Sequence, residues 1–125
     1  MAKFAHSDVL DGGLLAVKNN AIRMMLVKAY SFGDSYATCV GNKIAEVVMA
    51  PADYVIASSG NNRTLTVGAK SVAAVNASAV GDHHIVHHDN VGKVLLVTDE
   101  TGEAVSAAGD TINFPSHVYT APQPT

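Results

Sequence analysis

The sequence has a single cysteine, no tryptophan and few charged residues. Cys39 cannot form an intrachain disulfide or, on its own, a zinc site of the CxxC type, so we interpret it as a small apolar side chain. Charged residues make up 15% of the 125 residues, where ordinary soluble domains carry about 25%. Because assembly interfaces are depleted in lysine, glutamate and aspartate, this composition indicates that other subunits cover part of the surface.

The chain also lacks the features of nucleic-acid-binding and membrane proteins. Its eight lysines and arginines are dispersed and the net charge is −3, so no basic patch supports DNA or RNA binding. No run approaches the roughly 18 apolar residues of a transmembrane helix. The first ten residues include His6, Ser7 and Asp8, which are foreign to a signal-peptide core. We expect a protein of a cytoplasm with no nucleic-acid or membrane partner.

No pattern of residues indicates an enzyme. The sequence has no G-x-S-x-G elbow, no Walker loop and no G-x-G-x-x-G that opens a helix. His6-Ser7-Asp8 contains the residue types of a catalytic triad, but contiguous residues cannot point at one another in the required order. The carboxylates lie mostly at predicted turns, and nothing selects a catalytic pair. We therefore expect no catalytic residue, no cofactor and no small-molecule substrate.

The first 20 residues predict a short helix. Ser7 or Asp8 can cap it, and Asn19-Asn20 is expected to end it. Gly12-Gly13 weakens it by about 1 kcal/mol per glycine relative to alanine. Apolar residues recur on one face at i, i+4 and i+7, namely Leu10, Leu14 and Val17.

From residue 21 onward, short apolar runs alternate with turn residues, a pattern typical of β-sandwiches and small barrels. The expected strands are 21–30, 43–49, 53–57, 63–68, 70–75, 82–88, 93–98 and 111–114. The segment 31–41 has no clear period and is expected to be a loop with at most a helical turn. Residues 94–97 are apolar on both faces, so this strand is expected to be central or pressed against a neighbouring subunit. Turns are expected at 76–81, 99–102 and 107–110.

We therefore predict a mainly β, single-domain β-sandwich or small β-barrel with a short N-terminal helix. It comprises an N-terminal arm and helix over 1–20, a β core over 21–114 and an extended C-terminal tail over 115–125. The two ends, 1–11 and 116–125, are expected to be ordered mainly by other subunits, because they offer few apolar anchors against the entropy that ordering costs. The predicted core consists of Ile22, Met24, Leu26, Val47, Val55, Leu65, Val67, Val94, Leu96 and Ile112.

The most unusual local feature is the run from His83 to His88, which holds four histidines. On a helix, histidines four residues apart would lie one turn apart and could bind zinc or nickel. In a strand, which Ile85 and Val86 favour, the same pairs lie about 13 Å apart, so only a neighbouring strand or a symmetry axis could complete a metal site. We expect exposed strand histidines and no metal, with a pH-sensitive subunit contact as an alternative.

Residues 1–14, MAKFAHSDVLDGGL, followed by 18–21 and an apolar strand, resemble the start of small virion structural proteins of tailed bacteriophages. The similarity continues through 53–56, 63–67, 93–98 and 108–112 to a proline-containing tail, so it spans most of the chain. Its first part is the most specific. The segment 36–42 and the histidine run depart from the family's pattern.

The resemblance implies a non-enzymatic virion protein, most of all a capsid decoration or cement protein that binds the outside of the head and stabilises the shell. Its partners would be the major capsid protein and copies of itself, as a trimer, in particles assembled in the bacterial cytoplasm. A tail or head–tail connector component is the alternative, and a metal-dependent enzyme that uses the histidines is a third. The candidate subunit contacts are Phe4, Val9, Leu10, His84, His88, Val118 and Tyr119.

Overall fold

A computed structural model of the chain describes residues 2–77, 83–100 and 107–125. Within these residues, short strands follow an N-terminal helix, which confirms the predicted mainly β class. The elements are α1 (Ser7–Asn20), β1 (Arg23–Val27), α2 (Tyr36–Gly41), β2 (Lys43–Val48), the 3₁₀ helix η1 (Pro51–Asp53), β3 (Tyr54–Ser59), β4 (Asn62–Val67), β5 (Lys70–Ala73), β6 (His83–His88), β7 (Val94–Glu100), β8 (Thr111–Phe114) and β9 (His117–Ala121).

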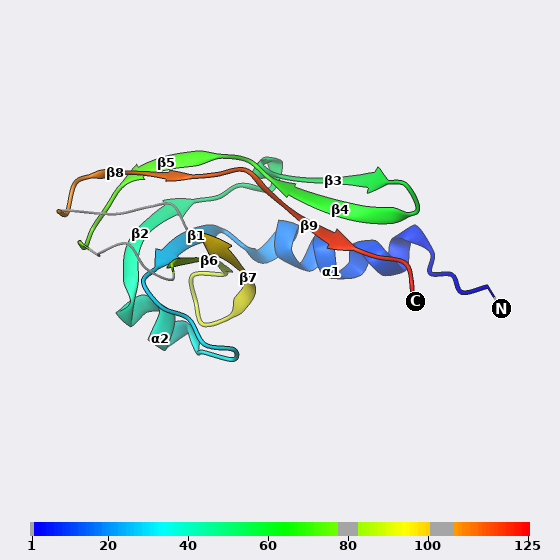
Figure 1. The fold of residues 1–125 in the computed structure, drawn as a ribbon, viewed down its shortest axis with the longest axis horizontal. Coiled ribbons are helices and arrows are strands. Elements are labelled where there is room, and N and C mark those ends of the chain that lie inside the picture. Colours follow the sequence, from blue (N-terminus) through cyan, green and yellow to red (C-terminus); the bar gives the residue numbers. More distant parts are fainter. Residues whose placement is uncertain (1, 78–82, 101–106) are drawn as a thin grey trace.

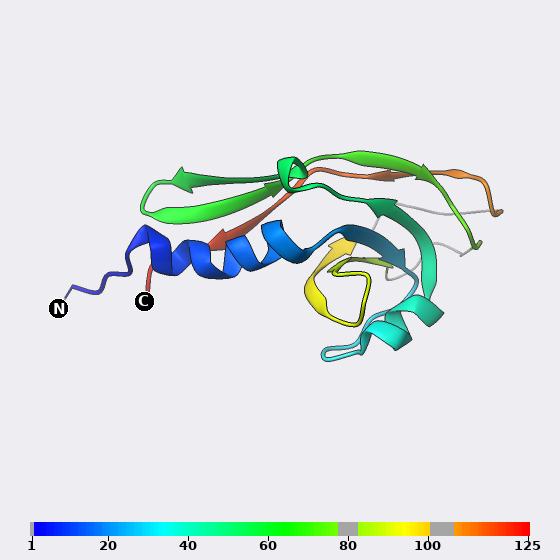
Figure 2. The ribbon, with the colours of Figure 1, turned by 180° about the vertical axis from the view of Figure 1, so that it is seen from behind.

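The strands form antiparallel sheets in two layers. One layer is the four-stranded sheet β2-β1-β6-β7, and the other combines β3-β4-β9 with β5-β8. Figure 1 shows the latter two sheets end to end along the top of the molecule, with α1 beneath β4 and β9. Figure 2 shows the same arrangement from behind. The fold is therefore elongated and sandwich-like.

The predicted N-terminal helix is present as α1, but neither Ser7 nor Asp8 caps it. His6 is the N-cap residue: its backbone is extended, with φ −64° and ψ 150°, and its Nδ1 accepts a hydrogen bond from the Asp8 N–H at 3.0 Å. Both expected caps therefore lie inside the first turn. Leu14 and Val17 are buried, so packing against the sheet supplies the stability that the two internal glycines remove.

The main core lies between the two layers. It includes five of the predicted core residues, Met24, Leu26, Leu65, Val67 and Ile112, with Val47 and Leu96 packed at its edge. The prediction is wrong for Ile22 and Val55, which are 44% and 55% exposed. Ile22 precedes β1, and Val55 points outward because its neighbour Tyr54 takes the buried position in β3.

A second, smaller core covers the opposite face of the four-stranded sheet, beneath α2. It contains Met25, Val27, Cys39 and Val86, with Tyr30, Tyr36, Val94 and Val97 packed against it. Cys39 is 1% exposed, as expected for a small apolar side chain, and burial raises the pKa of its thiol. Both faces of the four-stranded sheet are thus covered.

The second core explains why Val94 to Val97 are apolar on both faces. Among the described strands β7 is the edge of its sheet, so the prediction of a central strand is wrong. Its apolar residues on one face pack against the main core and on the other against the second core. The alternative prediction, a contact with a neighbouring subunit, stays a prediction.

Two of the predicted turns fall partly on residues that the structure does not describe, and the prediction for the C-terminal end is wrong. Residues 78–82 and 101–106 lie outside the described residues, and parts of the predicted turns at 76–81 and 99–102 and the first residue of the predicted 82–88 strand fall on them. Residues 99 and 100, expected in a turn, instead end β7, so the prediction is wrong there. The turn at 107–110 is present, with Gly109 at φ 95°. Residues 117–121 were expected in an extended tail but form β9, which pairs with β4 along its length.

Candidate docking site at the chain ends

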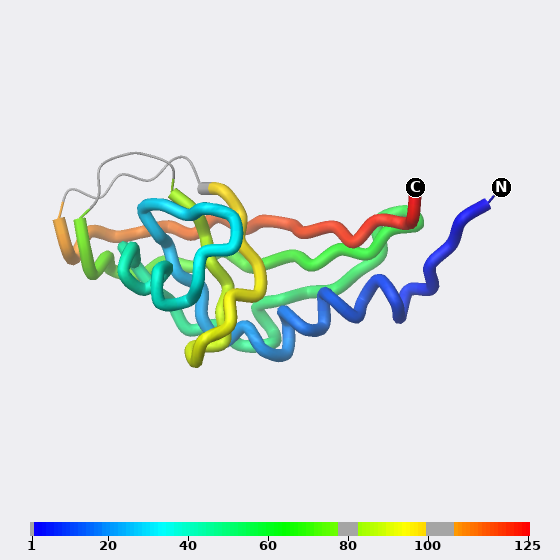
Figure 3. Tube along the Cα trace, turned by 90° about the horizontal axis from the view of Figure 1, so that it is seen from below, coloured from blue at the N-terminus to red at the C-terminus, as the bar shows by residue number. Residues whose placement is uncertain are grey.

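Both chain ends lie at the same end of the long axis, as Figure 3 shows. The N-terminal arm, the turn between β3 and β4, and the residues after β9 meet there. Between them is an open groove of about 810 Å³, formed by residues 3–7, Leu10, residues 58–63 and Gln123. We call it the tip groove.

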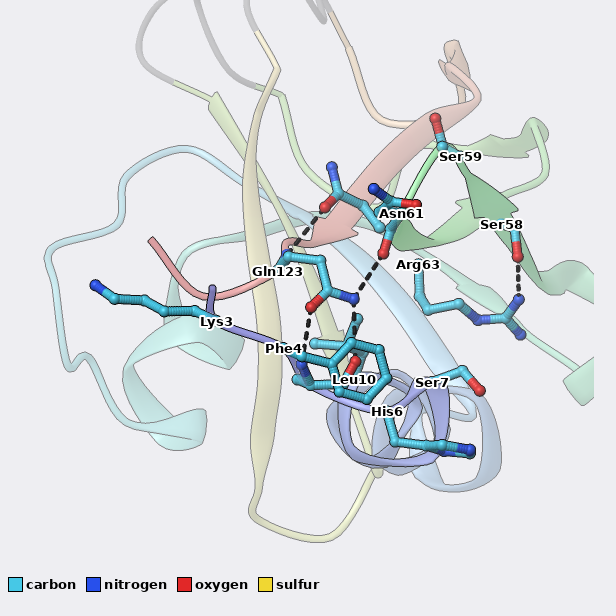
Figure 4. Close-up of a pocket in the computed structure, with 13 residues that line it drawn as sticks. Lys3, Phe4, His6, Ser7, Leu10, Ser58, Ser59, Asn61, Arg63 and Gln123 are labelled. Atoms are coloured by element: carbon cyan, nitrogen blue, oxygen red, sulfur yellow. Dashed lines mark hydrogen bonds between the residues drawn. The ribbon is translucent and has the colours of Figure 1, made fainter. Parts of the chain in front are cut away.

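The side chain of Gln123 holds the tip groove together (Figure 4). Its Oε1 accepts a hydrogen bond from the Ala5 N–H at 2.8 Å, and its Nε2 donates to the carbonyl oxygens of Ala5 at 3.0 Å and Asn61 at 2.8 Å. The Gln123 backbone N–H donates to Asn62 Oδ1 at 2.9 Å. The two ends of the chain are therefore fixed to one hairpin of their own domain, which contradicts the prediction that other subunits mainly order them.

Of the two cations of the tip groove, Arg63 is ion-paired and Lys3 is hydrogen-bonded to the backbone. Arg63 Nε and Nη2 donate to the two carboxylate oxygens of Asp11 at 2.7 and 3.1 Å, and Arg63 Nη1 donates to Ser58 Oγ at 2.7 Å. Asp11 raises the pKa of the Arg63 guanidinium. Lys3 Nζ donates to the carbonyl oxygen of Thr125. What the groove offers a partner is therefore amide and hydroxyl groups, with no activated nucleophile in the described lining.

Apolar side chains flank this polar groove. Phe4 is 76% exposed on the arm and Val9 is 70% exposed on the first turns of α1. Leu10 is half-buried and lines the groove with Phe4. Two of the predicted contact residues, Phe4 and Leu10, thus line the tip groove, and Val9 precedes Leu10 in α1 without being part of the lining. The other two apolar ones, Val118 and Tyr119, lie along β9 on its opposite faces and are 57% and 44% exposed.

The prediction of exposed strand histidines is wrong for β6. His83, His87 and His88 are fully buried and His84 is half-buried, because β6 lies between β1 and β7 in a sheet covered on both faces. His84 Nε2 lies 2.9 Å from Asp99 Oδ1. The extended backbone also rules out the helical metal site.

His88, predicted as a subunit contact, is instead an interior residue. Its Nδ1 accepts a hydrogen bond from the Asn90 N–H at 2.9 Å, so its Nε2 carries the proton and donates to Glu46 Oε2 at 2.8 Å. Burial lowers the pKa of His88, although Glu46 opposes the shift. A neighbouring subunit cannot reach this side chain in the folded domain.

His87 belongs to a chain of hydrogen bonds that links the two layers and runs from the buried Tyr54 to the surface at Pro115. His117 Nδ1 lies 3.0 Å from the carbonyl oxygen of Pro115, so it must donate and leave Nε2 as an acceptor. His87 Nε2 then donates to His117 Nε2 at 3.0 Å, and Tyr54 Oη donates to His87 Nδ1 at 3.0 Å. Burial, with nearby His117 and His88, lowers the pKa of His87 to about 3, and burial raises that of Tyr54.

The described residues contain no group of three or more histidine, cysteine, aspartate or glutamate side chains that could hold a metal ion. The facing nitrogens of His87 and His117 are accounted for by their hydrogen bond. This arrangement makes the histidines part of the packing between layers.

Sequence reasoning missed several residues that build these sites. Gln123 lies between two prolines and gave no signal, and His117 was assigned to a tail. Asn61 and Asn62 lie between the expected strands 53–57 and 63–68, where the sequence predicted no site. The ion pair of Arg63 and Asp11 joins positions 52 apart in sequence, which no local pattern could reveal.

No family model, curated protein or solved structure matches this chain. Neither of the α-helices in the described ranges is long and apolar enough to cross a membrane.

Proposed function

We propose that this chain is a non-enzymatic structural protein of a bacteriophage particle, a decoration protein that docks on the outside of the head through the tip groove. The observation that carries the proposal is the exposure of Phe4 and Val9 at the end of the molecule where Arg63 of the tip groove is already paired with Asp11. Large apolar side chains held in solvent at one end of a molecule are typical of a contact with another protein.

The resemblance to virion proteins supports the same end of the molecule. Its most specific part, residues 1–14, folds as the arm and the first turns of α1, which form the tip groove together with the β3–β4 turn. At a joint between shell subunits, the amide groups of the tip could form hydrogen bonds and its apolar side chains could be buried. Repetition over a lattice then compensates for a small contact.

The first test is the composition of purified particles. We expect mass spectrometry to detect the chain in particles of the phage that encodes it, and electron microscopy of labelled chain to place it at lattice joints over the shell. Density in rings around one axis would support a connector or tail component instead. Absence of the chain from the particles, or stoichiometric bound metal with an activity lost on His84→Ala, would overturn the proposal.

The second test asks whether the tip is the docking end. Phe4→Ser and Val9→Ser should each weaken binding to particles stripped of the chain by about 10-fold to 100-fold, the expected effect of one buried apolar side chain. Phe32→Ser is the matched control, because Phe32 is also an exposed phenylalanine but lies in the loop between β1 and α2. Equal binding by all three variants would mean that the chain docks through another surface.

A further inference from the structure

The outer face of the β3-β4-β9 sheet has no charged side chain. Tyr54, Leu65 and Val67 are fully buried on the inner face, so the residues that alternate with them point away from the core. The registers align these outward residues in two complete rows across the three strands: Val55, Thr66 and Val118, and Ala57, Thr64 and Thr120. We call these six residues the outer face.

This face is open in the described part of the molecule. Val55 and Val118 are 55% and 57% exposed, and in Figures 1 and 2 no helix or strand lies above the sheet apart from the short coil of η1 at its junction with β5-β8. The adjoining β5-β8 sheet continues with uncharged outward residues, Ser71, Ala73, Thr111 and Asn113. At the junction of the two sheets, Lys70 Nζ and Asp53 Oδ1 are 3.1 Å apart and pair with each other.

The absence of charge restricts what can cover the outer face. A nucleic acid would find no cation there, and a partner with charged groups would have to bury them unpaired, at a considerable cost. A second copy brings an identical face of methyl and hydroxyl groups, so neither side buries a charge. We propose that two copies of this chain pair through their outer faces, sheet against sheet about a two-fold axis.

The size of the face sets the strength of this pairing. The two six-residue strands and the five-residue β9 span roughly 270 Å², from a strand spacing of about 4.8 Å and a rise of about 3.3 Å per residue. That is well below the roughly 800 Å² per partner of a stable standard interface. The pair therefore forms at high concentration and dissociates on dilution. Crowding of copies on a surface would supply such a concentration, but the pairing does not depend on the proposed docking at the tip.

The test is the molar mass of the purified full-length chain, by light scattering or sedimentation, from about 1 µM to about 1 mM. We expect mass to rise from one copy to two, with little effect of salt because no charges meet. Val118→Lys should keep the chain monomeric throughout the concentration range. Val91→Lys is the control: it makes the same substitution at an 83% exposed valine in the turn after β6, and this variant should pair normally.

Each outcome decides the proposal. A wild-type chain that stays monomeric at the highest concentration overturns it, as does a Val118→Lys chain that pairs as tightly as Val91→Lys. Because Val118 lies in a paired strand, thermal unfolding should first establish that the variant folds; Ala57→Lys on β3 provides a second variant of the same face. A monomeric chain that still binds particles would leave the docking proposal intact, so the two failures are distinguishable.

Discussion

The buried side chain of His87 makes the stability of the domain depend on pH. Both ring nitrogens of His87 are hydrogen-bonded, Nδ1 to the Tyr54 hydroxyl and Nε2 to His117. With all three side chains neutral, Tyr54 donates to His87 and His87 donates to His117. A proton added to His87 would leave Tyr54 Oη without its acceptor and place a charge next to two other imidazoles. The folded domain therefore keeps His87 neutral.

We predict that the domain loses stability on acidification below about pH 6.5. Unfolded His87 binds a proton near its ordinary pKa of 6.5, whereas folded His87 does so only near 3. Between these values the unfolded state binds more protons, so the free energy of unfolding falls by up to about 1.4 kcal/mol per pH unit as pH decreases, and is unaffected by His87 above this window. Urea unfolding at a series of pH values measures the slope.

Two variants assign this slope to its source. His87→Gln should lower the free energy of unfolding at neutral pH but flatten its dependence between about pH 6.5 and pH 3. Tyr54→Phe should cost about 1–3 kcal/mol at neutral pH, because His87 Nδ1 loses its donor, and should retain the histidine's pH dependence. An unchanged slope in the His87 variant would exclude His87 as its origin.

At the scale of elements, the sequence predicts strands well where one face is buried. The alternation of Leu65 and Val67 with threonines identifies β4, and both residues are fully buried. Alternation cannot say which strands become neighbours, because the pairing of β4 with β9 joins residues that are 50 to 58 positions apart. For β9 itself, Pro122 and Pro124 argued for a tail although His117, Tyr119 and Ala121 alternate as in a strand.

The site was predicted less well than the fold for the same reason. Phe4, Val9 and Leu10 were identified as candidate contacts close in sequence, and of these Phe4 and Leu10 line the tip groove. The clamp by Gln123 depends on two chain ends that meet only in the folded molecule, 118 positions apart. The histidines of β6 are buried because the second core covers the other face of their sheet, and the pattern of a single strand cannot reveal such a cover.

We predict that alanine at Gly12 or Gly13 stabilises the domain. Both glycines lie inside α1, a Cβ at either position would meet no atom within 4 Å, and neither has a positive φ. Each substitution should therefore raise the free energy of unfolding by up to about 1 kcal/mol, because alanine loses less backbone entropy in a helix. Thermal unfolding measures the gain. Gly109→Ala is the contrasting variant: its φ of 95° should make the same change destabilising.

At the scale of the whole molecule, the C-terminal residues join all parts of the fold. β9 adds the third strand to β3-β4 and contacts α1, His117 reaches His87 of the other layer, and Gln123 holds the N-terminal arm. In Figure 3 this last segment runs along the full length of the sheet to end beside the N-terminus. The ends therefore serve the domain's own stability before any contact with a neighbour.

Deletion of residues 116–125 should thus destabilise the isolated domain, contrary to the expectation for a docking tail. It removes the strand that pairs with β4, leaves His87 Nε2–H buried without its acceptor at a cost of about 1–3 kcal/mol, and removes the Gln123 hydrogen bonds at about 0.5–1.5 kcal/mol each. We expect the Tm to fall by at least about 10 °C. Deletion of residues 124–125 alone keeps β9 and Gln123 and loses only the exposed contact of Lys3, so its Tm should stay within about 2 °C of wild type. Equal Tm values for the two truncated chains would mean that β9 contributes nothing to the stability of the domain.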